Sequence, residues 1–350
     1  MTIRCISAAI VVVAGCTRIG FVSPPDGARE VSTFDAVVSD STIADARSDL
    51  PSGDAAPMAE RDLIEADVVL DTPTTVGWKS IGTGAVTADL TGICGLGSKD
   101  LFIVGTGGLA LHYDGANLTV INAGTGNDLN GVWCGANDAF AVGNNGTLVR
   151  LGASGSGGNQ WNHGKESFRG VWGSGASNIF AVGDNGSVSR FDGAAWSALI
   201  SPTTESLRGV WGASPSDVFA VGFNGTLLRY TGGLWSKMIS PSAKHLRTVW
   251  GTSSGDVYTV GTNATILRFD GSAWSGMLAP ITTSLRGIWG RSKADIFAVG
   301  LAGTILRYDG TKWAPMSSGV KVDLLSVSGT SDPSGAVYAV GAGGTVLQLE

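Results

Sequence analysis

Four evenly spaced arginines are the residues of this sequence best suited to binding a ligand. They recur every 39 residues in the second place of a phrase such as Leu207-Arg208-Gly209-Val210-Trp211-Gly212, and they are Arg169, Arg208, Arg247 and Arg286, with Asn130 in that place one unit earlier. Guanidinium groups brought together would bind an anion such as a carboxylate or a sulfate. The alternative is that each arginine pairs with an acid that repeats in step with it, such as Asp217, Asp256 or Asp295. The matching repeat of these acids favours the alternative.

Two cysteines are candidates for a disulfide. Cys94 and Cys134 lie in the same phrase of adjacent units, but they are offset by one position. An oxidising cell envelope would permit a bond between them. The offset directs the two side chains to opposite faces, which favours two buried free thiols, and the disulfide stays an open alternative.

The sequence offers little for metal chemistry. Its histidines, His112, His163 and His245, are scattered, and no Cys-x-x-Cys pair occurs. Zinc sites bring such ligands together at characteristic spacings. We therefore predict no metal site and no cofactor.

An internal repeat predicts the elements that position these residues. Each unit of about 39 residues offers four apolar runs of about five residues, too short and too interrupted by glycine for helices. Asn-Gly pairs between the second and third runs permit the positive backbone angles of a tight hairpin. Four antiparallel strands per unit are typical of a β-propeller blade, whose first strands line the axis. The tryptophans that mark the first runs are Trp133, Trp172, Trp211, Trp250 and Trp289.

The number of units and the way the ring closes also follow from the repeat. Units start near residues 90, 129, 168, 207, 246, 285 and 325, which makes seven blades. The last unit ends at Glu350 without a fourth strand, and the missing strand lies upstream at Gly77–Ile81. We predict an all-β, seven-bladed propeller over residues 76–350, closed by this N-terminal strand, with the tryptophans packed between neighbouring blades. Closure would protect the edges that an open array exposes.

The N-terminus resembles a bacterial lipoprotein signal. Met1 to Arg4 give a positive start, Ile6 to Val13 are apolar but too few to span a bilayer, and Val13-Ala14-Gly15-Cys16 resembles a lipobox. The resemblance implies a signal peptide over residues 1–15, lipidation of Cys16 and a membrane anchor. Because Thr17 rather than an aspartate follows the cysteine, it also implies the outer membrane of the cell envelope. The alternative is an ordinary signal peptide with a chance cysteine.

Charge separates the segment after Cys16 from the propeller. Residues 17–75 hold 12 acidic and 4 basic side chains, whereas residues 76–350 hold 17 and 18. The acidic, proline-punctuated segment cannot bury enough apolar surface to fold, so residues 16–75 are predicted to be a disordered tether. The nearly neutral propeller lacks the basic surface of a nucleic-acid-binding protein, so no nucleic-acid partner is predicted.

The turn before the fourth strand carries a family resemblance. Tyr308-Asp309-Gly310-Thr311-Lys312-Trp313 resembles the Asp-box of BNR-type propellers, which include sialidases and photosystem assembly factors. The resemblance implies that Asp192, Asp270 and Asp309 form turns. Sialidase-like catalysis would need a tyrosine with a nearby glutamate and an acidic proton donor. Beyond residue 76 the glutamates are Glu166, Glu205 and Glu350, and no unit carries an unusual polar cluster, so no catalytic residues are predicted.

These features together predict a monomeric surface lipoprotein whose propeller binds a protein or a glycan without transforming it. One alternative is a divergent sialidase-like glycoside hydrolase or lyase. Another is an assembly factor for an envelope complex. The loops between fourth and first strands share one rim and are candidate binding loops or, equally, solvated connections: Ser201–Ser206, Ser240–His245, Pro280–Ser284 and Ser317–Val322.

Overall fold

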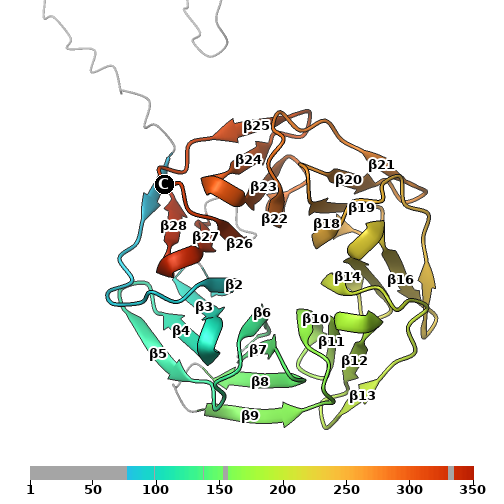
Figure 1. Ribbon diagram of the computed structural model, residues 1–350, viewed down its shortest axis with the longest axis horizontal. Coiled ribbons are helices and arrows are strands. Elements are labelled where there is room, and N and C mark those ends of the chain that lie inside the picture. The colour runs from blue at the N-terminus through green and yellow to red at the C-terminus, as the bar shows by residue number, and fades with distance from the viewer. Residues whose placement is uncertain (1–76, 98, 137, 153–156, 330–334) are drawn as a thin grey trace, which may run out of the picture. The chain divides into compact units, whose positions relative to one another are not determined.

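The propeller predicted from the repeat is present. The computed structural model describes residues 77–350, except 98, 137, 153–156 and 330–334. These residues form seven four-stranded antiparallel sheets around a central opening (Figure 1). The predicted signal peptide (1–15), the tether (16–75) and Cys16 lie outside the described residues. Within the described part of the chain, no helix is long and apolar enough to cross a bilayer.

Each blade takes its strands in chain order from the axis outwards. Blade 1 consists of β2 (Leu90–Gly97), β3 (Asp100–Gly105), β4 (Leu109–Tyr113) and β5 (Leu118–Asn122). Blade 2 consists of β6 (Leu129–Cys134), β7 (Asp138–Gly143), β8 (Thr147–Gly152) and β9 (Gly157–Asn162). Blade 3 consists of β10 (Phe168–Gly175), β11 (Asn178–Gly183), β12 (Val188–Phe191) and β13 (Trp196–Ala198). Blade 4 consists of β14 (Leu207–Ser214), β15 (Asp217–Gly222), β16 (Leu227–Thr231) and β17 (Leu234–Lys237). Blade 5 consists of β18 (Leu246–Ser253), β19 (Asp256–Gly261), β20 (Ile266–Phe269) and β21 (Trp274–Gly276). Blade 6 consists of β22 (Leu285–Ser292), β23 (Asp295–Gly300), β24 (Ile305–Tyr308) and β25 (Trp313–Met316). Blade 7 combines β26 (Leu324–Gly329), β27 (Val337–Gly341) and β28 (Val346–Leu349) with β1 (Trp78–Ser80).

The ring closes as predicted, through the first and last strands of the chain. β1 pairs antiparallel with β28, with Trp78 opposite Leu349 and Ser80 opposite Leu347. Backbone hydrogen bonds continue this pairing at both ends, from Ile81 N to the Val346 carbonyl (2.9 Å) and from Glu350 N to the Gly77 carbonyl (3.0 Å). Blade 7 therefore has no unpaired outer edge on β28.

The Asn-Gly hairpins form as the sequence predicts. Asn224 has φ 52° and Gly225 has φ 69°, so both residues adopt the left-handed conformation that the turn requires. A side chain at Gly225 would also collide with the neighbouring loop, because a Cβ there would lie 1.8 Å from the Ser242 carbonyl oxygen. The turn therefore packs directly against the loop that leads to the next blade.

The aspartate turns before the fourth strands also form. Asp309 accepts hydrogen bonds from the backbone N–H groups of Thr311 and Lys312, both at 2.8 Å. The hydroxyl of Thr311 and these N–H groups lower the pKa of Asp309 to about 2. Asp270 accepts the equivalent bonds, and Asp192 accepts those from the backbone, so all three aspartates act as turn-formers.

The tryptophans occupy two different places. Four of those in the fourth strands are buried between blades; Trp235, for example, is 7% exposed and packs edge-on against Phe180 of blade 3. Those of the first strands, such as Trp211, are half-buried, and so are Trp78 and Trp161. The prediction that the tryptophans pack between blades is therefore confirmed most clearly for Trp196, Trp235, Trp274 and Trp313, and in part for the others.

Candidate anion-binding site at the propeller axis

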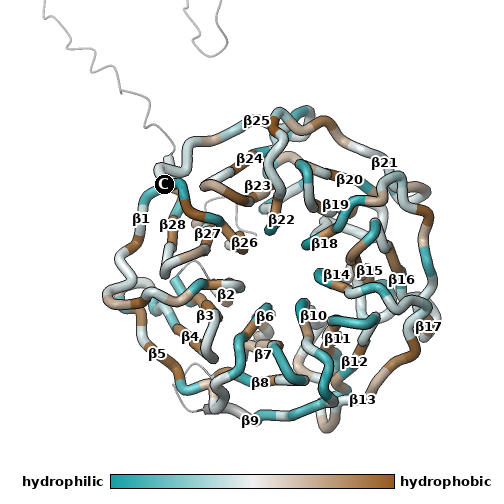
Figure 2. Tube along the Cα trace, viewed as in Figure 1, coloured by the Kyte–Doolittle hydropathy of each residue, from teal (hydrophilic) through white to brown (hydrophobic). Residues whose placement is uncertain are grey.

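The four repeated arginines line one end of the central opening. Each is the second residue of a first strand, β10, β14, β18 or β22, and together they border a cavity of about 290 Å³. Blades 1, 2 and 7 contribute Thr91, Asn130 and Leu325 at the same place. Hydrophilic residues therefore mark the inner tips of β10, β14, β18 and β22, whereas the tips of β2 and β26 are paler or apolar (Figure 2). The cavity has one cationic side, formed by blades 3–6.

The predicted pairing of these arginines with Asp217, Asp256 and Asp295 is wrong. Asp217 starts its strand opposite Ser214, six residues beyond Arg208, which corresponds to about 20 Å along a strand. At that far end Asp217 accepts hydrogen bonds from Arg229 at 2.8 and 2.9 Å. The equivalent pairs are Asp256 with Arg268 (2.8 Å) and Asp295 with Arg307 (2.7 Å). The acids therefore bind third-strand arginines and leave the axial ones to other partners.

Only one carboxylate reaches the axial arginines in the described residues. Asp184 accepts a hydrogen bond from Arg169 at 2.6 Å and lies 3.7 Å from Arg208. Burial alone would raise the pKa of Asp184, but these two arginines lower it below its ordinary value. Arg247 and Arg286 have no carboxylate within ion-pair distance in this part of the chain. The cationic side of the cavity thus carries more positive charge than its single acid neutralises.

Three of the axial arginines have buried Nε atoms, and two of them also contact an aromatic ring. The Nε atoms of Arg208, Arg247 and Arg286 are buried and have no hydrogen-bond partner among the described residues. The Phe223 ring lies 4.4 Å from the Arg208 guanidinium and 5.6 Å from that of Arg247, and the His245 ring packs against it at 4.4 Å. Burial, together with the charges of Arg286 and Arg208, lowers the pKa of Arg247 to about 10. An anion in the cavity would relieve this repulsion between the guanidinium groups.

The lining of this cavity suits binding better than proton transfer. Besides the arginines it consists of apolar side chains, glycines, threonines, a serine and an asparagine, with no carboxylate, histidine or cysteine. General acid–base catalysis needs such a group within reach of the reacting atom. Across the described residues, no three His, Cys, Asp or Glu side chains are grouped so that they could hold a metal ion.

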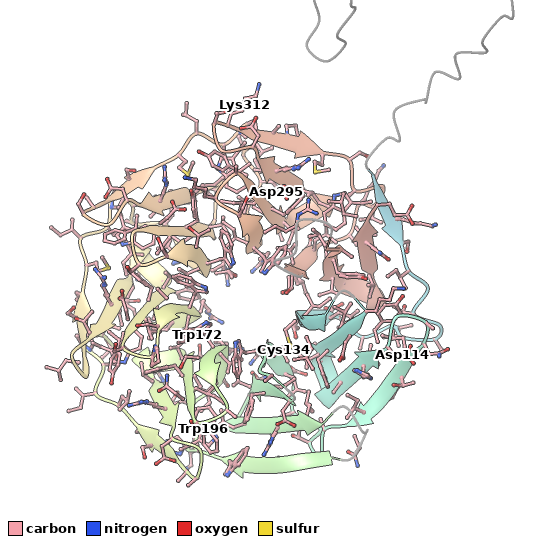
Figure 3. All side chains as sticks on the ribbon, turned by 180° about the vertical axis from the view of Figure 1, so that it is seen from behind. Asp114, Cys134, Trp172, Trp196, Asp295 and Lys312 are labelled. Atoms are coloured by element: carbon pink, nitrogen blue, oxygen red, sulfur yellow. A yellow bond between two sulfur atoms is a disulfide. The ribbon has the colours of Figure 1, made fainter. Side chains whose placement is uncertain are left out.

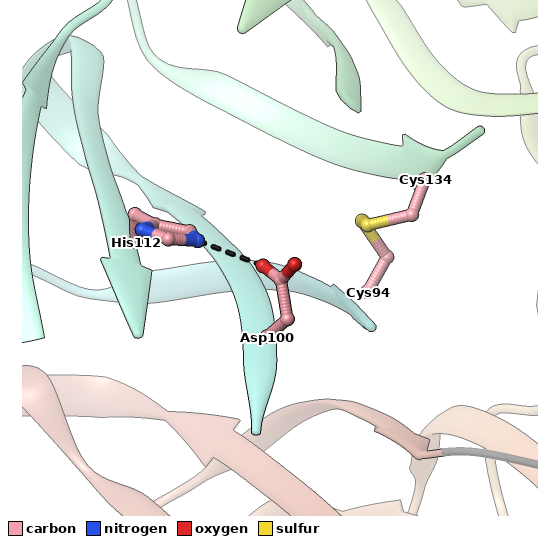
Figure 4. Close-up of a disulfide and its surroundings, with 4 residues drawn as sticks. All are labelled: Cys94, Asp100, His112 and Cys134. Atoms are coloured by element: carbon pink, nitrogen blue, oxygen red, sulfur yellow. Dashed lines mark hydrogen bonds and ion pairs between the residues drawn. A yellow bond between two sulfur atoms is a disulfide. The ribbon is translucent and has the colours of Figure 1, made fainter. Parts of the chain in front are cut away.

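The preference for free thiols at Cys94 and Cys134 is wrong, because the structure joins them in a disulfide (Figure 4). In other blades the first-strand tryptophan touches the glycine 40 residues later: a Cβ on Gly173 would lie 2.8 Å from the Trp133 ring. Cys94 stands in the tryptophan place of blade 1, and Cys134 stands in the glycine place of blade 2. The offset of one position is therefore the register in which adjacent blades meet, and the disulfide takes the place of a tryptophan–glycine contact.

Two residues that contact the axial arginines were not anticipated from the sequence. Phe223 and Asp184 both hold the first place of the turn between second and third strands, where other units have Thr106, Asn144, Thr262, Leu301 or Ala342. An aromatic residue at a turn position where no other unit has one was the available signal for Phe223. Asp184 could have been recognised as the one acid at that place.

Comparison with known proteins supports the fold alone. No protein-family model and no curated protein matches the chain. Among solved structures, it is similar to "YCF48 bound to D1 peptide" (TM-score 0.64, 17% identity, 80% of this chain and 99% of that chain). It is also similar to YCF48 from Cyanidioschyzon merolae (TM-score 0.64, 15% identity, 78% of this chain and 99% of that chain). The chain therefore shares the seven-bladed propeller architecture of these proteins.

Proposed function

We propose that the propeller is a non-catalytic scaffold that binds a protein partner by taking one of its carboxylates into the arginine cavity. The observation that carries this proposal is the pair Arg247 and Arg286, which line the cavity and have no carboxylate within ion-pair distance among the described residues. A carboxylate matches the planar fork of a guanidinium better than a spherical ion does.

The size and setting of the cavity favour the end of a polypeptide or an acidic side chain. A volume of about 290 Å³ holds only a small group. The loops Ser201–Ser206 and Ser240–His245 pack against the turns beside it, since Thr203 and Ser242 contact the turn glycines Gly186 and Gly225. A bound peptide could continue from the cavity over these loops. YCF48, whose structure is similar, has been solved bound to D1 peptide.

A binding experiment with matched peptides tests this proposal. The probe is a fluorescein-labelled peptide ending in Asp-Glu with a free carboxylate, compared with its Asn-Gln amide. We expect the full-length chain to bind the acid at least about tenfold more tightly, and Arg247→Gln/Arg286→Gln to lose that preference. Arg150→Gln/Arg268→Gln, which removes two charges from the Asp138 and Asp256 ion pairs, should keep it. Equal binding of both peptides, or an unchanged preference in the double variant, would contradict the proposal.

We also propose that the chain is a lipoprotein anchored through Cys16 to the outer membrane. The support is the charged, apolar and small-residue order of Met1–Cys16 in the sequence. Cys16→Ser should move the protein from the membrane fraction to the soluble fraction and abolish metabolic labelling with an alkyne fatty acid. Retention of both labelling and membrane association in that variant would refute the anchor.

A further inference from the structure

The end of the central opening remote from the arginines contains a second cavity. Its volume is about 460 Å³, and its side chains are Leu96, Trp250, Thr252, Trp289 and Arg291, with glycines between them. Trp250 and Trp289 lie three residues beyond Arg247 and Arg286 on their first strands, towards the other face of the propeller. This size falls within the range of small-molecule sites.

Indole faces are the main feature of this end. The first strands of blades 2–6 each carry a tryptophan at the same place, and two of these, Trp250 and Trp289, line the cavity. Figure 3 shows Trp172 beside the central opening, whereas Trp196 lies near the outer edge. Trp250 has its outward neighbour Tyr258 at 6.3 Å with the ring planes 31° apart, and its edge abuts Gly290 of the next blade. Since the first strand is innermost, the remaining face of the indole is directed towards the axis.

The series of first-strand tryptophans is absent from blades 7 and 1, which leaves space for a ligand on that side of the cavity. Blade 7 has Ser328 in the tryptophan place, and blade 1 has Cys94, whose side chain is used by the disulfide. The residues that border the cavity on that side include Gly329 and Gly95, which project no side chain into it. A flat group can therefore lie against Trp250 and Trp289 without meeting a ring opposite.

Polar groups beside the indoles are fixed in place. Arg291 donates to the Asp295 carboxylate at 2.5 Å and to the Gly335 carbonyl at 3.2 Å. The exposed Thr252 donates its hydroxyl hydrogen to Asp256 at 2.8 Å and keeps its oxygen as an acceptor. Asp295 accepts hydrogen bonds from both Arg291 and Arg307, so the Arg291 guanidinium has a carboxylate beside it, unlike Arg247 and Arg286 at the other end. The fixed Arg291 guanidinium and the Thr252 oxygen supply a donor and an acceptor suited to a ligand rich in hydroxyl groups.

We propose that this tryptophan-lined cavity binds a neutral carbohydrate, with a pyranose ring stacked on Trp250 and Trp289. The C–H groups on one side of a pyranose form an apolar patch that fits an indole face. Its hydroxyls are neutral donors and acceptors that can bond to a fixed Arg–Asp pair and to a threonine hydroxyl. The site is separate from the arginine cavity and does not depend on the proposed carboxylate binding.

Titration with neutral trisaccharides tests the proposal. Cellotriose, maltotriose, mannotriose and chitotriose are added to the full-length chain, and binding is followed by calorimetry and tryptophan fluorescence. We expect at least one of them to bind, and Trp289→Ala to weaken that binding at least about tenfold. Trp172→Ala is the matched control, because it removes the equivalent ring of blade 3, which does not line the cavity, and should leave affinity within about twofold. Arg291→Gln should weaken binding while keeping both indoles.

Other outcomes would overturn the proposal. Binding of none of the four sugars, or equal loss in Trp172→Ala and Trp289→Ala at matched folded fraction, would do so. Preference for tetramethylammonium over every sugar would replace the carbohydrate with a cation. Arg247→Gln/Arg286→Gln should leave sugar binding unchanged, so failure of either proposed site can be recognised without reference to the other.

Discussion

Replacing Arg247 by methionine is expected to stabilise the propeller while removing a ligand-binding group. Arg247 is partly buried, has the charges of Arg286 and Arg208 nearby, and has no carboxylate partner among the described residues. Folding therefore moves a cation into surroundings less favourable than water. Methionine keeps much of the side-chain volume without this cost.

The magnitude follows from the pKa of Arg247, which folding lowers from the ordinary value of an arginine to about 10. Each tenfold change in proton affinity corresponds to about 1.4 kcal/mol, so the full cost would be about 3 kcal/mol. Partial exposure screens the charges, and we expect a gain of about 1–2 kcal/mol. Because the pKa of a cation is lowered, the cost is fully present at every pH below about 10 and declines as the pH rises from that value towards the pKa of an arginine in the unfolded chain. The gain should therefore be constant across neutral pH.

Urea denaturation at low salt measures this effect, with Arg229→Met as the control. Arg229 is paired with Asp217, so its replacement should destabilise the fold by about 1–3 kcal/mol. Added sulfate should stabilise the parent more than Arg247→Met, because the anion binds the arginine cavity. A loss of stability in Arg247→Met comparable to that in Arg229→Met would refute the reasoning, since it would show that Arg247 is held by favourable contacts.

Three further predictions concern closure, the disulfide and the turns. Deletion of residues 76–83 should lower the melting temperature and expose β28 to self-association, measurable by calorimetry and light scattering; a monomer as heat-resistant as the parent would disprove closure through β1. Cys94→Trp/Cys134→Gly restores the contact found in other blades and should make the denaturation midpoint insensitive to dithiothreitol, whereas Cys94→Ser should cost about 2–4 kcal/mol. The turn hydrogen bonds lower the pKa of Asp270 to about 2, so the stabilisation that they give is complete above about pH 4 and is lost as the pH falls towards 2. In Asp270→Ala the free energy of unfolding, measured by denaturation at each pH, should therefore fall less steeply between about pH 4 and pH 2.

The fold was predictable because the same pattern of strands and turns recurs in all seven units of the sequence. The tryptophan spacing gave the period, the Asn-Gly pairs gave the hairpins, and the unmatched Trp78 strand indicated how the ring closes. These signals are local, and each is confirmed by the observed pairing. Redundancy among blades made the number of blades insensitive to any single substitution.

The candidate site was less predictable because it depends on which end of a strand a residue occupies. Asp217 repeats in step with Arg208, yet the antiparallel register places the two at opposite ends of the blade. The one-position offset of Cys94 and Cys134 led to the wrong prediction of free thiols for a related reason. Adjacent blades pack with a shift of one residue, and the sequence of a single strand does not reveal that shift. Contacts between blades, unlike those within them, require the three-dimensional arrangement.

The most direct test of the central claim is to locate a carboxylate in the arginine cavity. Crystals soaked in 4-bromobenzoate would report its position through the anomalous signal of bromine. We expect a peak at the axial opening, with the carboxylate against Arg247 and Arg286, and no peak in Arg247→Gln/Arg286→Gln crystals. An empty cavity in the parent, or the same peak in the double variant, would contradict it.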